Sequence, residues 1–225
     1  MRSGRLDTRI RREQIAQAAL ALIAAKGLRG LSLAAVAKQV GLVPSAIYRH
    51  FESKDRLLDV TMEHLGERLL SNVHVVEEET QDPVERLHRL LARHMKLIRE
   101  NQAVPRIIFT EGVYGGRTER KDRVRTIITR YIEHIAQFVL DGQRSGRIRP
   151  DLDPRAAAVT FLGLILPPAV LWHLSDGGFD PTRQSERGWS IFRAGIEIQG
   201  PPAATARAVR AARGRRARAK KGGAA

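Results

Sequence analysis

LSLAAVAKQVGLVPSAIYRHFESKDRLL, residues 31–58, is the stretch that decides the fold. Ser32 is suited to cap a short helix, because its hydroxyl can accept a hydrogen bond from a backbone N–H in the first turn. Gly41 is suited to end that helix, because glycine takes positive φ at low cost. Pro44 fits the first position of a second helix, where its missing N–H would have no intrahelical acceptor. Two short helices joined by a tight glycine-containing turn predict a helix-turn-helix, whose second helix enters the major groove of DNA.

The outward face of the second helix contains no acid. Ile47 and Phe51 are four residues apart and share the inward face. The outward residues are small, aromatic, hydroxyl-bearing or cationic: Ser45, Ala46, Tyr48, Arg49 and His50. A merely solvated face usually fills with Glu, Lys and Gln, whereas these residue types suit phosphates, base edges and thymine methyl groups. We therefore interpret this face as a DNA-contacting surface.

Lys54 departs from a local rule of helix formation. Ser53 is the predicted N-cap of the next helix, which places Lys54 in the first turn, where a cation opposes the helix dipole. A residue that violates a local rule is a candidate for function. We predict that Lys54 contacts a DNA phosphate.

A resemblance to the tetracycline-repressor (TetR) family of bacterial regulators rests on IYRHFESKDRLL at residues 47–58, with Gly41-Leu42 and LAAVA at 33–37 before it. It covers residues 8–68 and implies an all-α homodimer, with a three-helix DNA-binding head and a C-terminal domain whose small-molecule ligand weakens DNA binding. Val43 departs from the pattern, because the family usually has Ser or Thr there and valine cannot cap a helix. The resemblance places DNA contacts at Ser32, Pro44, Ser45, Ala46, Tyr48, Arg49, His50 and Lys54.

Positive charge is concentrated at the two ends of the chain. Lys and Arg number 39 against 24 Asp and Glu, for a net charge of +15. Residues 1–60 hold 11 basic and 5 acidic side chains, and residues 200–225 hold 8 basic side chains and no acid. This distribution is typical of a nucleic-acid-binding protein. Cysteine is absent, which excludes disulfides and thiolate metal sites and is compatible with a cytoplasmic location.

The remaining sequence predicts an all-α chain of about nine helices in three parts. Residues 8–68 form the helix-turn-helix domain, 69–199 an effector-binding and dimerisation domain, and 200–225 a basic disordered tail. Residues 1–7 are also expected to be disordered. Asp-Pro pairs at 82, 153 and 180 each combine a cap with a first-turn proline and so mark helix starts. The predicted helices span residues 9–26, 54–76, 83–100, 104–109, 118–144, 154–174 with a bend at Pro167-Pro168, and 181–198.

Two apolar segments raise alternatives that involve membranes. A signal peptide after the N-terminal arginines is disfavoured, because Glu13, Gln14 and Gln17 interrupt the apolar run. Residues 156–172 are apolar apart from Thr160, but this length is at the short limit for crossing a bilayer. We interpret the segment as a buried or dimer-forming helix and expect no membrane association. In the last predicted helix, Gly188, Phe192 and Gly195 fall on one side and are predicted to form a dimer interface.

Signatures of catalysis are missing from the sequence. It has no HExxH, no GxSxG and no Gly-rich phosphate loop, and its histidines lack ligand spacing. We expect no enzymatic activity, no metal and no cofactor.

The effector site is the part that the sequence determines least. His94 lies on the apolar face of helix 83–100, as either a core histidine or a polar anchor in a ligand cavity. Few acids face inward on helices 83–100 and 118–144, which favours a hydrophobic ligand over a multiply cationic one. Aromatic residues that either line this cavity or fill the core are Phe109, Tyr131, Phe138, Phe161 and Trp172.

Together these features lead to one hypothesis and one alternative. The hypothesis is a homodimeric repressor that a small hydrophobic effector releases from a palindromic double-stranded DNA operator. The alternative is a constitutive DNA-binding protein without sequence preference. A regulator should bind its operator at least about 10³ times more tightly than bulk DNA.

The basic tail generates a prediction of its own, with a solubilising extension as the alternative. If it contacts phosphates, each neutralised phosphate adds about 0.9 to the slope of log affinity against log salt. A chain truncated after Gln199 should then show a shallower slope and lower affinity for random DNA, while keeping or improving its preference for operator. Titrations between about 50 and 200 mM salt measure the slope; equal slopes for both chains would favour the solubilising alternative.

Overall fold

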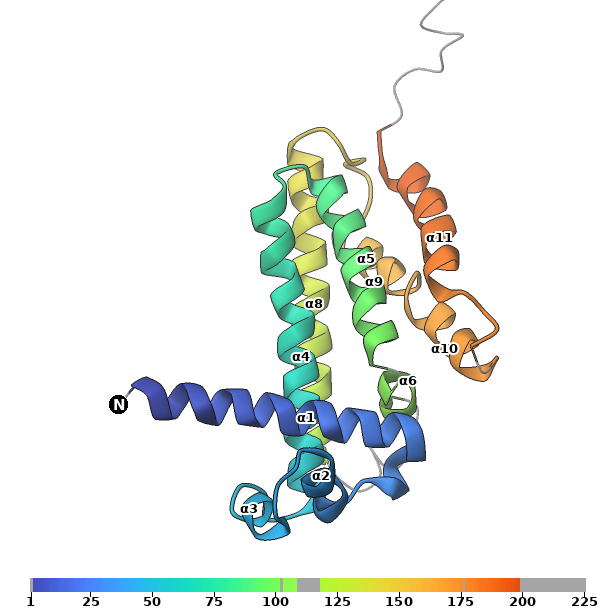
Figure 1. The fold of residues 1–225 in the computed structure, drawn as a ribbon. Coiled ribbons are helices and arrows are strands. Elements are labelled where there is room, and N and C mark those ends of the chain that lie inside the picture. The colour runs from blue at the N-terminus through green and yellow to red at the C-terminus, as the bar shows by residue number, and fades with distance from the viewer. Residues whose placement is uncertain (1, 102, 109–117, 176, 199–225) are drawn as a thin grey trace, which may run out of the picture.

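The computed structural model describes residues 2–101, 103–108, 118–175 and 177–198. Within these ranges it contains ten helices and no strand, with an isolated bridge between Ile148 and Glu197. The prediction of an all-α fold is confirmed. In Figure 1 the long helices of the C-terminal part stand above the head, and the first helix lies across their lower ends. The predicted basic tail, residues 200–225, lies outside the described residues.

Three helices form the head: α1 (Arg2–Gly30), α2 (Leu33–Gln39) and α3 (Pro44–Tyr48). Helix α1 begins at Arg2, seven residues before the start that the sequence predicts at residue 9. Extending an existing helix avoids the cost of nucleating a new one, which favours this longer helix. The predicted end of the first helix at residue 26 agrees with the backbone, because Gly27 takes a non-helical φ of 67° and a separate short helical stretch follows it within α1.

Three long helices run side by side in the C-terminal part (Figure 1): α4 (Lys54–Glu79), α5 (Pro83–Glu100) and α8 (Thr118–Arg144). Helix α4 leaves the head and enters this part as one rod, as predicted, although it continues to Glu79 rather than ending near residue 76. The predicted domain boundary between residues 68 and 69 therefore falls inside a continuous helix.

Shorter helices complete the described fold: α6 (Ala103–Ile108), α9 (Pro154–Leu162), α10 (Leu166–Leu174) and α11 (Pro181–Ile196). The three helix starts predicted at Asp-Pro pairs are confirmed. A carboxylate oxygen of Asp82 accepts from Val84 N–H at 2.9 Å. Asp153 and Asp180 cap α9 and α11 in the same way.

The predicted single helix over 154–174 is wrong. The chain breaks at Gly163–Ile165 into α9 and α10 rather than bending at Pro167-Pro168. These prolines fall in the first turn of α10, where a missing N–H breaks no intrahelical bond. The prolines thus help to start a helix instead of kinking one.

Residues Pro154–Leu174 also meet the length and composition criteria for a membrane span, and they are the one such segment among the described residues. Apolar core helices pass the same test. Here the segment is divided between two helices, and Ala158, Phe161 and Ile165 are fully buried in the protein core.

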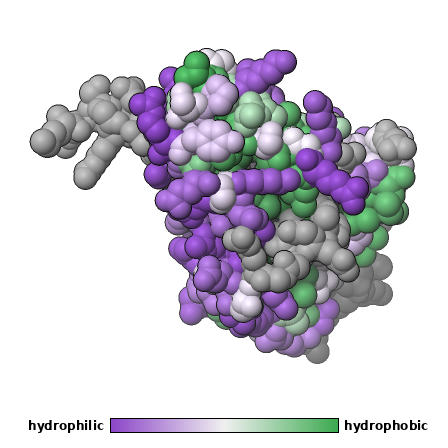
Figure 2. Space-filling view, turned by 90° about the horizontal axis from the view of Figure 1, so that it is seen from below, coloured by the Kyte–Doolittle hydropathy of each residue, from purple (hydrophilic) through white to green (hydrophobic). Residues whose placement is uncertain are grey.

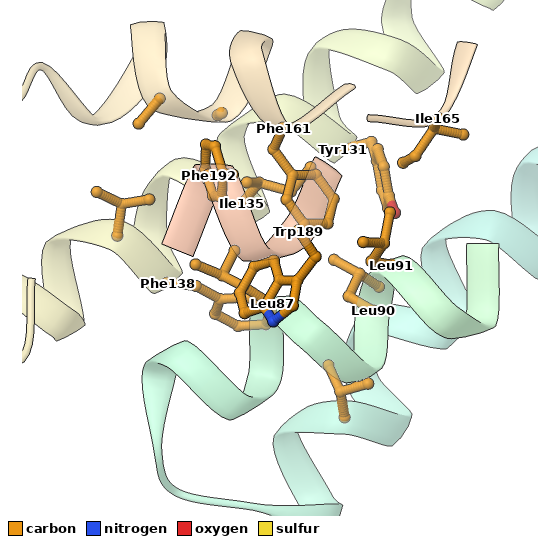
Figure 3. Close-up of a cluster of buried hydrophobic side chains, with 14 of the residues drawn as sticks. Leu87, Leu90, Leu91, Tyr131, Ile135, Phe138, Phe161, Ile165, Trp189 and Phe192 are labelled. Carbon is orange, nitrogen blue, oxygen red and sulfur yellow. The ribbon is translucent and has the colours of Figure 1, made fainter. Parts of the chain in front are cut away.

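Two hydrophobic cores hold the molecule together. The larger joins α5, α8, α9 and α11, and Figure 3 shows Leu87, Phe138, Phe161 and Trp189 converging from these helices. The smaller core lies in the head and includes Ile47 and Phe51. Ala103 and Ile107 of α6 belong to this second core, although they are far from the head in sequence. Helix α6 is therefore packed as part of the head.

The predicted dimer interface needs correction at Phe192. Its ring is buried and lies 5.9 Å from the rings of both Phe161 and Trp189. Because α11 uses this face to close the larger core, the face that it exposes is the one with Ile191, which is 77% exposed. Gly195 faces open space, as an interface glycine would.

Candidate DNA interface and effector cavity

Helix α3 presents the outward face that the sequence predicts. Ile47 is fully buried and fixes the inward side, while Tyr48 is 57% exposed. Pro44 and Ser45 are exposed and Ala46 is half-buried. The predicted contact residues Arg49 and His50 are exposed in the turn that follows the last residue of α3. Hydrophilic residues cover much of the molecular face on the side of the head (Figure 2).

Capping at the two helix-turn-helix helices follows the sequence analysis. The Ser32 hydroxyl oxygen accepts from the Ala35 N–H at 3.1 Å and leaves its O–H proton free to donate to DNA. Val43 occupies the cap of α3 and makes no side-chain hydrogen bond there. The N-terminal end of α3 therefore lacks the hydroxyl cap that the family pattern usually supplies.

Lys54 has a structural role that the sequence analysis missed. Its ammonium donates to the backbone carbonyl of Leu28, at 2.6 Å from Nζ to the oxygen, and so ties the start of α4 to the end of α1. This bond gives the first-turn lysine a favourable partner. An ammonium has three donors, so an exposed Lys54 can also reach a phosphate. No sequence signal links residues 28 and 54.

Arg120 fastens α8 to the same end of α4. Its guanidinium is buried, and Nε donates to an Asp59 carboxylate oxygen at 2.7 Å. Nη2 donates to Asp55 through a carboxylate oxygen at 3.2 Å and the backbone oxygen at 3.3 Å. We call these contacts, with the Lys54–Leu28 bond, the α4 junction. A nearby pair between Arg123 and Glu63, at 2.6 Å, is more exposed.

A cavity of about 100 Å³ lies between α4, α5, α6 and α8. Among the described residues that line it, His94 is the single polar side chain and none is charged. The lining residues are Met62, Leu65, Gly66 and Leu69 from α4, His94, Leu97 and Ile98 from α5, Val104 and Ile107 from α6, and Val124, Ile127 and Ile128 from α8.

His94 combines the two alternatives that the sequence left open. It lines the cavity, and its Nδ1 lies 3.1 Å from the Tyr131 hydroxyl. Burial lowers the pKa of His94 to about 4, because the low-dielectric interior disfavours the charged imidazolium. Burial also raises the pKa of Tyr131. Both groups are therefore neutral near pH 7.

The other proposed ligand-binding residues lie elsewhere. Tyr131, Phe138 and Phe161 are buried in the larger core (Figure 3), and Trp172 packs against that core from a half-buried position. None of these four is among the residues that line the cavity. Phe109 lies outside the described residues. Leu65 and Leu69, which do line it, belong to an apolar side of α4, and an apolar periodicity alone does not distinguish a cavity wall from a filled core.

Ile107 belongs to both the cavity and the head. It lines the cavity, and its fully buried side chain is also part of the head core. Val104, one turn earlier on α6, lines the cavity beside it. A molecule bound in the cavity would therefore contact a side chain that also packs in the head core.

Metal chemistry has no visible site in the part of the chain that the structure describes. No group of three or more His, Asp or Glu side chains is arranged there to hold a metal ion.

Comparison with known proteins gives matches over both parts of the chain. Residues 15–67 match the model described as bacterial regulatory proteins, tetR family. Residues 80–196 match the model described as tetracyclin repressor-like, C-terminal domain. A curated relative, the nucleoid occlusion factor SlmA of Vibrio vulnificus (strain YJ016), is 28% identical over 189 residues, which cover 83% of this chain and 96% of the relative.

Solved structures share the fold at lower sequence identity. The transcriptional regulator FadR from Bacillus subtilis, in complex with stearoyl-CoA, has a TM-score of 0.68 and 23% identity, over 82% of this chain and 99% of that chain. A transcriptional regulator from Saccharomonospora viridis, in complex with choline, has a TM-score of 0.72 and 20% identity, over 84% of this chain and 98% of that chain.

The Arg120 contacts generate a stability prediction. Arg120→Gln removes the guanidinium that donates to Asp59 and Asp55, and hydrogen bonds to charged groups are worth about 1.5–3 kcal/mol. We expect the free energy of unfolding to fall by about 1–3 kcal/mol. The range begins below the value for one such bond because Asp55 is partly exposed and solvent screens its interaction with Arg120. Arg123→Gln is the matched control on α8, and its exposed pair should cost less than about 1 kcal/mol. Urea unfolding measures both, and equal losses would contradict a special role for Arg120.

Proposed function

Because the chain belongs to the tetR family of bacterial regulatory proteins, we propose that this DNA-binding regulator is a repressor whose operator affinity is controlled by a small hydrophobic effector. The operator is a palindromic double-stranded site. The effector enters the cavity between α4, α5, α6 and α8 and shifts the heads to a spacing that no longer matches the operator.

The main support for this proposal is that the side chain of Ile107 both lines the cavity and packs in the head core. A ligand in the cavity presses on Ile107, which cannot move without disturbing the head core to which it belongs. The α4 junction then limits how the head can respond, because α1, α4 and α8 are fastened together there. To shift a 1:99 population to 99:1, the effector must favour the released state by about 5.5 kcal/mol.

Docking on DNA is proposed to use the exposed face of α3 and the turn after it. Tyr48 meets base edges, and the cations Arg49 and Lys54 neutralise phosphates. In a dimer, two such faces would sit about 34–36 Å apart, one turn of B-DNA. The proposed contact set is Ser32, Pro44, Ser45, Ala46, Tyr48, Arg49, His50 and Lys54.

The proposed homodimer uses the apolar surface that α9, α10 and α11 leave exposed. Val159, Leu166, Leu171 and Ile191 are large apolar residues of these three helices that the fold does not bury. Scattered exposed apolar residues are ordinary, but a group on consecutive helices marks an interaction surface. Gly195 on α11 would allow a second helix to approach closely.

A constitutive DNA-binding role is the second candidate. It is favoured by the curated relative, which is named as a nucleoid occlusion factor, and by the basic residues 207–221. The two candidates differ in sequence preference and in effector response. A DNA-coating protein needs neither, whereas a repressor needs both.

Selection of bound sequences from random DNA tests the proposed repressor. We expect a palindromic site bound at least about 10³ times more tightly than bulk DNA. Tyr48→Ala should reduce operator affinity about tenfold or more, as expected for loss of a base contact, and leave unfolding unchanged. Gln137→Ala, an exposed change on α8, is the control. A ratio near one for the wild type would support the constitutive alternative, and unchanged affinity in Tyr48→Ala would remove α3 as the reading helix.

Sedimentation at micromolar concentration tests the dimer. The wild-type protein should have the mass of two chains, and Ile191→Glu should have the mass of one with its helix content unchanged, because it places a charge in an apolar interface. Gln137→Glu adds the same charge on exposed α8 as a control. A wild-type mass of one chain would contradict the proposed interface.

A further inference from the structure

We infer that the cavity between α4, α5, α6 and α8 binds a compact, uncharged molecule with an apolar skeleton and one hydrogen-bond-accepting oxygen, which His94 binds through Nε2–H. Ketones, lactones and small esters have this chemistry. The inference rests on the proposed function, because it concerns the same effector cavity, and it adds the chemical class of the effector.

The lining of the cavity disfavours a charged ligand. Of the twelve described residues that line it, eleven are apolar and the remaining one is His94. A carboxylate, phosphate or ammonium group placed there would lose hydration without gaining an ion pair from these twelve residues. Burying a charge in this way is far more costly than burying a neutral polar group.

The hydrogen bond between Tyr131 and His94 determines which nitrogen faces the ligand. The Tyr131 hydroxyl is buried, and its one hydrogen-bond partner among the described residues is His94 Nδ1, at 3.1 Å. Because a buried polar hydrogen without an acceptor is costly, we assign the Tyr131 O–H as the donor and Nδ1 as the acceptor. A neutral imidazole that accepts at Nδ1 holds its proton at Nε2. His94 remains neutral, because burial lowers its pKa to about 4.

This arrangement leaves one donor for the ligand. His94 makes no hydrogen bond besides the one to Tyr131 within the described ranges, and its side chain lines the cavity. A ligand with an acceptor oxygen satisfies Nε2–H, whereas a pure hydrocarbon leaves it without a partner. The site therefore discriminates in favour of an oxygen at one position of an otherwise apolar molecule.

The size of the cavity favours a compact molecule. Its volume of about 100 Å³ is of the same order as the roughly 150 Å³ of an engineered apolar cavity that binds benzene. Helices α4 and α8 are close at Gly66, where an added Cβ would lie 2.5 Å from Ile127 Cδ1. The walls therefore cannot separate without moving these helices, which is the movement that the proposed release of DNA requires.

Four ring probes of similar size test the inference on the full chain without DNA. They are cyclohexanone, its near-isostere methylenecyclohexane, cyclohexanecarboxylate and cyclohexylammonium, each titrated at millimolar concentration by ligand-observed NMR. We expect cyclohexanone to bind about tenfold more tightly than methylenecyclohexane, as expected for one hydrogen bond. The two charged probes should bind more weakly than either.

Two variants separate the role of His94 from a loss of fold. His94→Phe should bind both neutral probes equally, and its retained binding of methylenecyclohexane would show an intact cavity. His94→Gln keeps a donor and should retain most of the preference for cyclohexanone. Tighter binding of a charged probe, equal binding of the two neutral probes to the wild type, or no binding of any probe would each overturn the inference.

Regulation is measured separately, as release of selected operator DNA by each of the four ring probes. A charged effector that releases operator would preserve the proposed regulation and overturn the inference about ligand class. A preference for cyclohexanone together with no effector-dependent release would support the ligand class and overturn the regulation.

Discussion

The side chain of Ile107 is fully buried between two parts of the protein that have different tasks. On one side it belongs to the core under the helix-turn-helix, and on the other it forms part of the cavity wall. Close-packed interiors transmit displacement because they contain few voids into which a side chain can relax. The placement of α6 therefore gives the proposed effector a direct contact with the head core, without any long chain of contacts.

Polar contacts at the α4 junction complement this apolar coupling. The ammonium of Lys54 holds α1, and the guanidinium of Arg120 holds α8, within about one turn of each other on α4. Both are charge-assisted hydrogen bonds, which are stronger than bonds between neutral groups. These bonds hold the first turns of α4 in place relative to α1 and α8, so any tilt of α4 would occur about these turns.

Features encoded by nearby residues could be predicted from sequence. The caps at Ser32 and Ser53, the Asp-Pro helix starts and the Ile47/Phe51 face each depend on residues within four positions, and all are present as expected. Contacts between distant residues could not be predicted. The Arg120–Asp59 pair spans 61 positions, and the cavity draws on four helices whose apolar stripes resemble those of a filled core. Phe192 was assigned to the wrong face for the same reason, because periodicity identifies an apolar side but not the partner that covers it.

The neutral state of His94 also links the cavity to acid stability. In the unfolded chain a histidine takes up a proton near pH 6.5, whereas His94 in the folded protein does so only near pH 4. Between these values the unfolded state binds more protons, so the folded state loses stability as the pH falls. Above pH 6.5 neither state is protonated at this residue and the contribution disappears. The imidazole that presents a donor to the cavity is thus also a point at which acid favours unfolding.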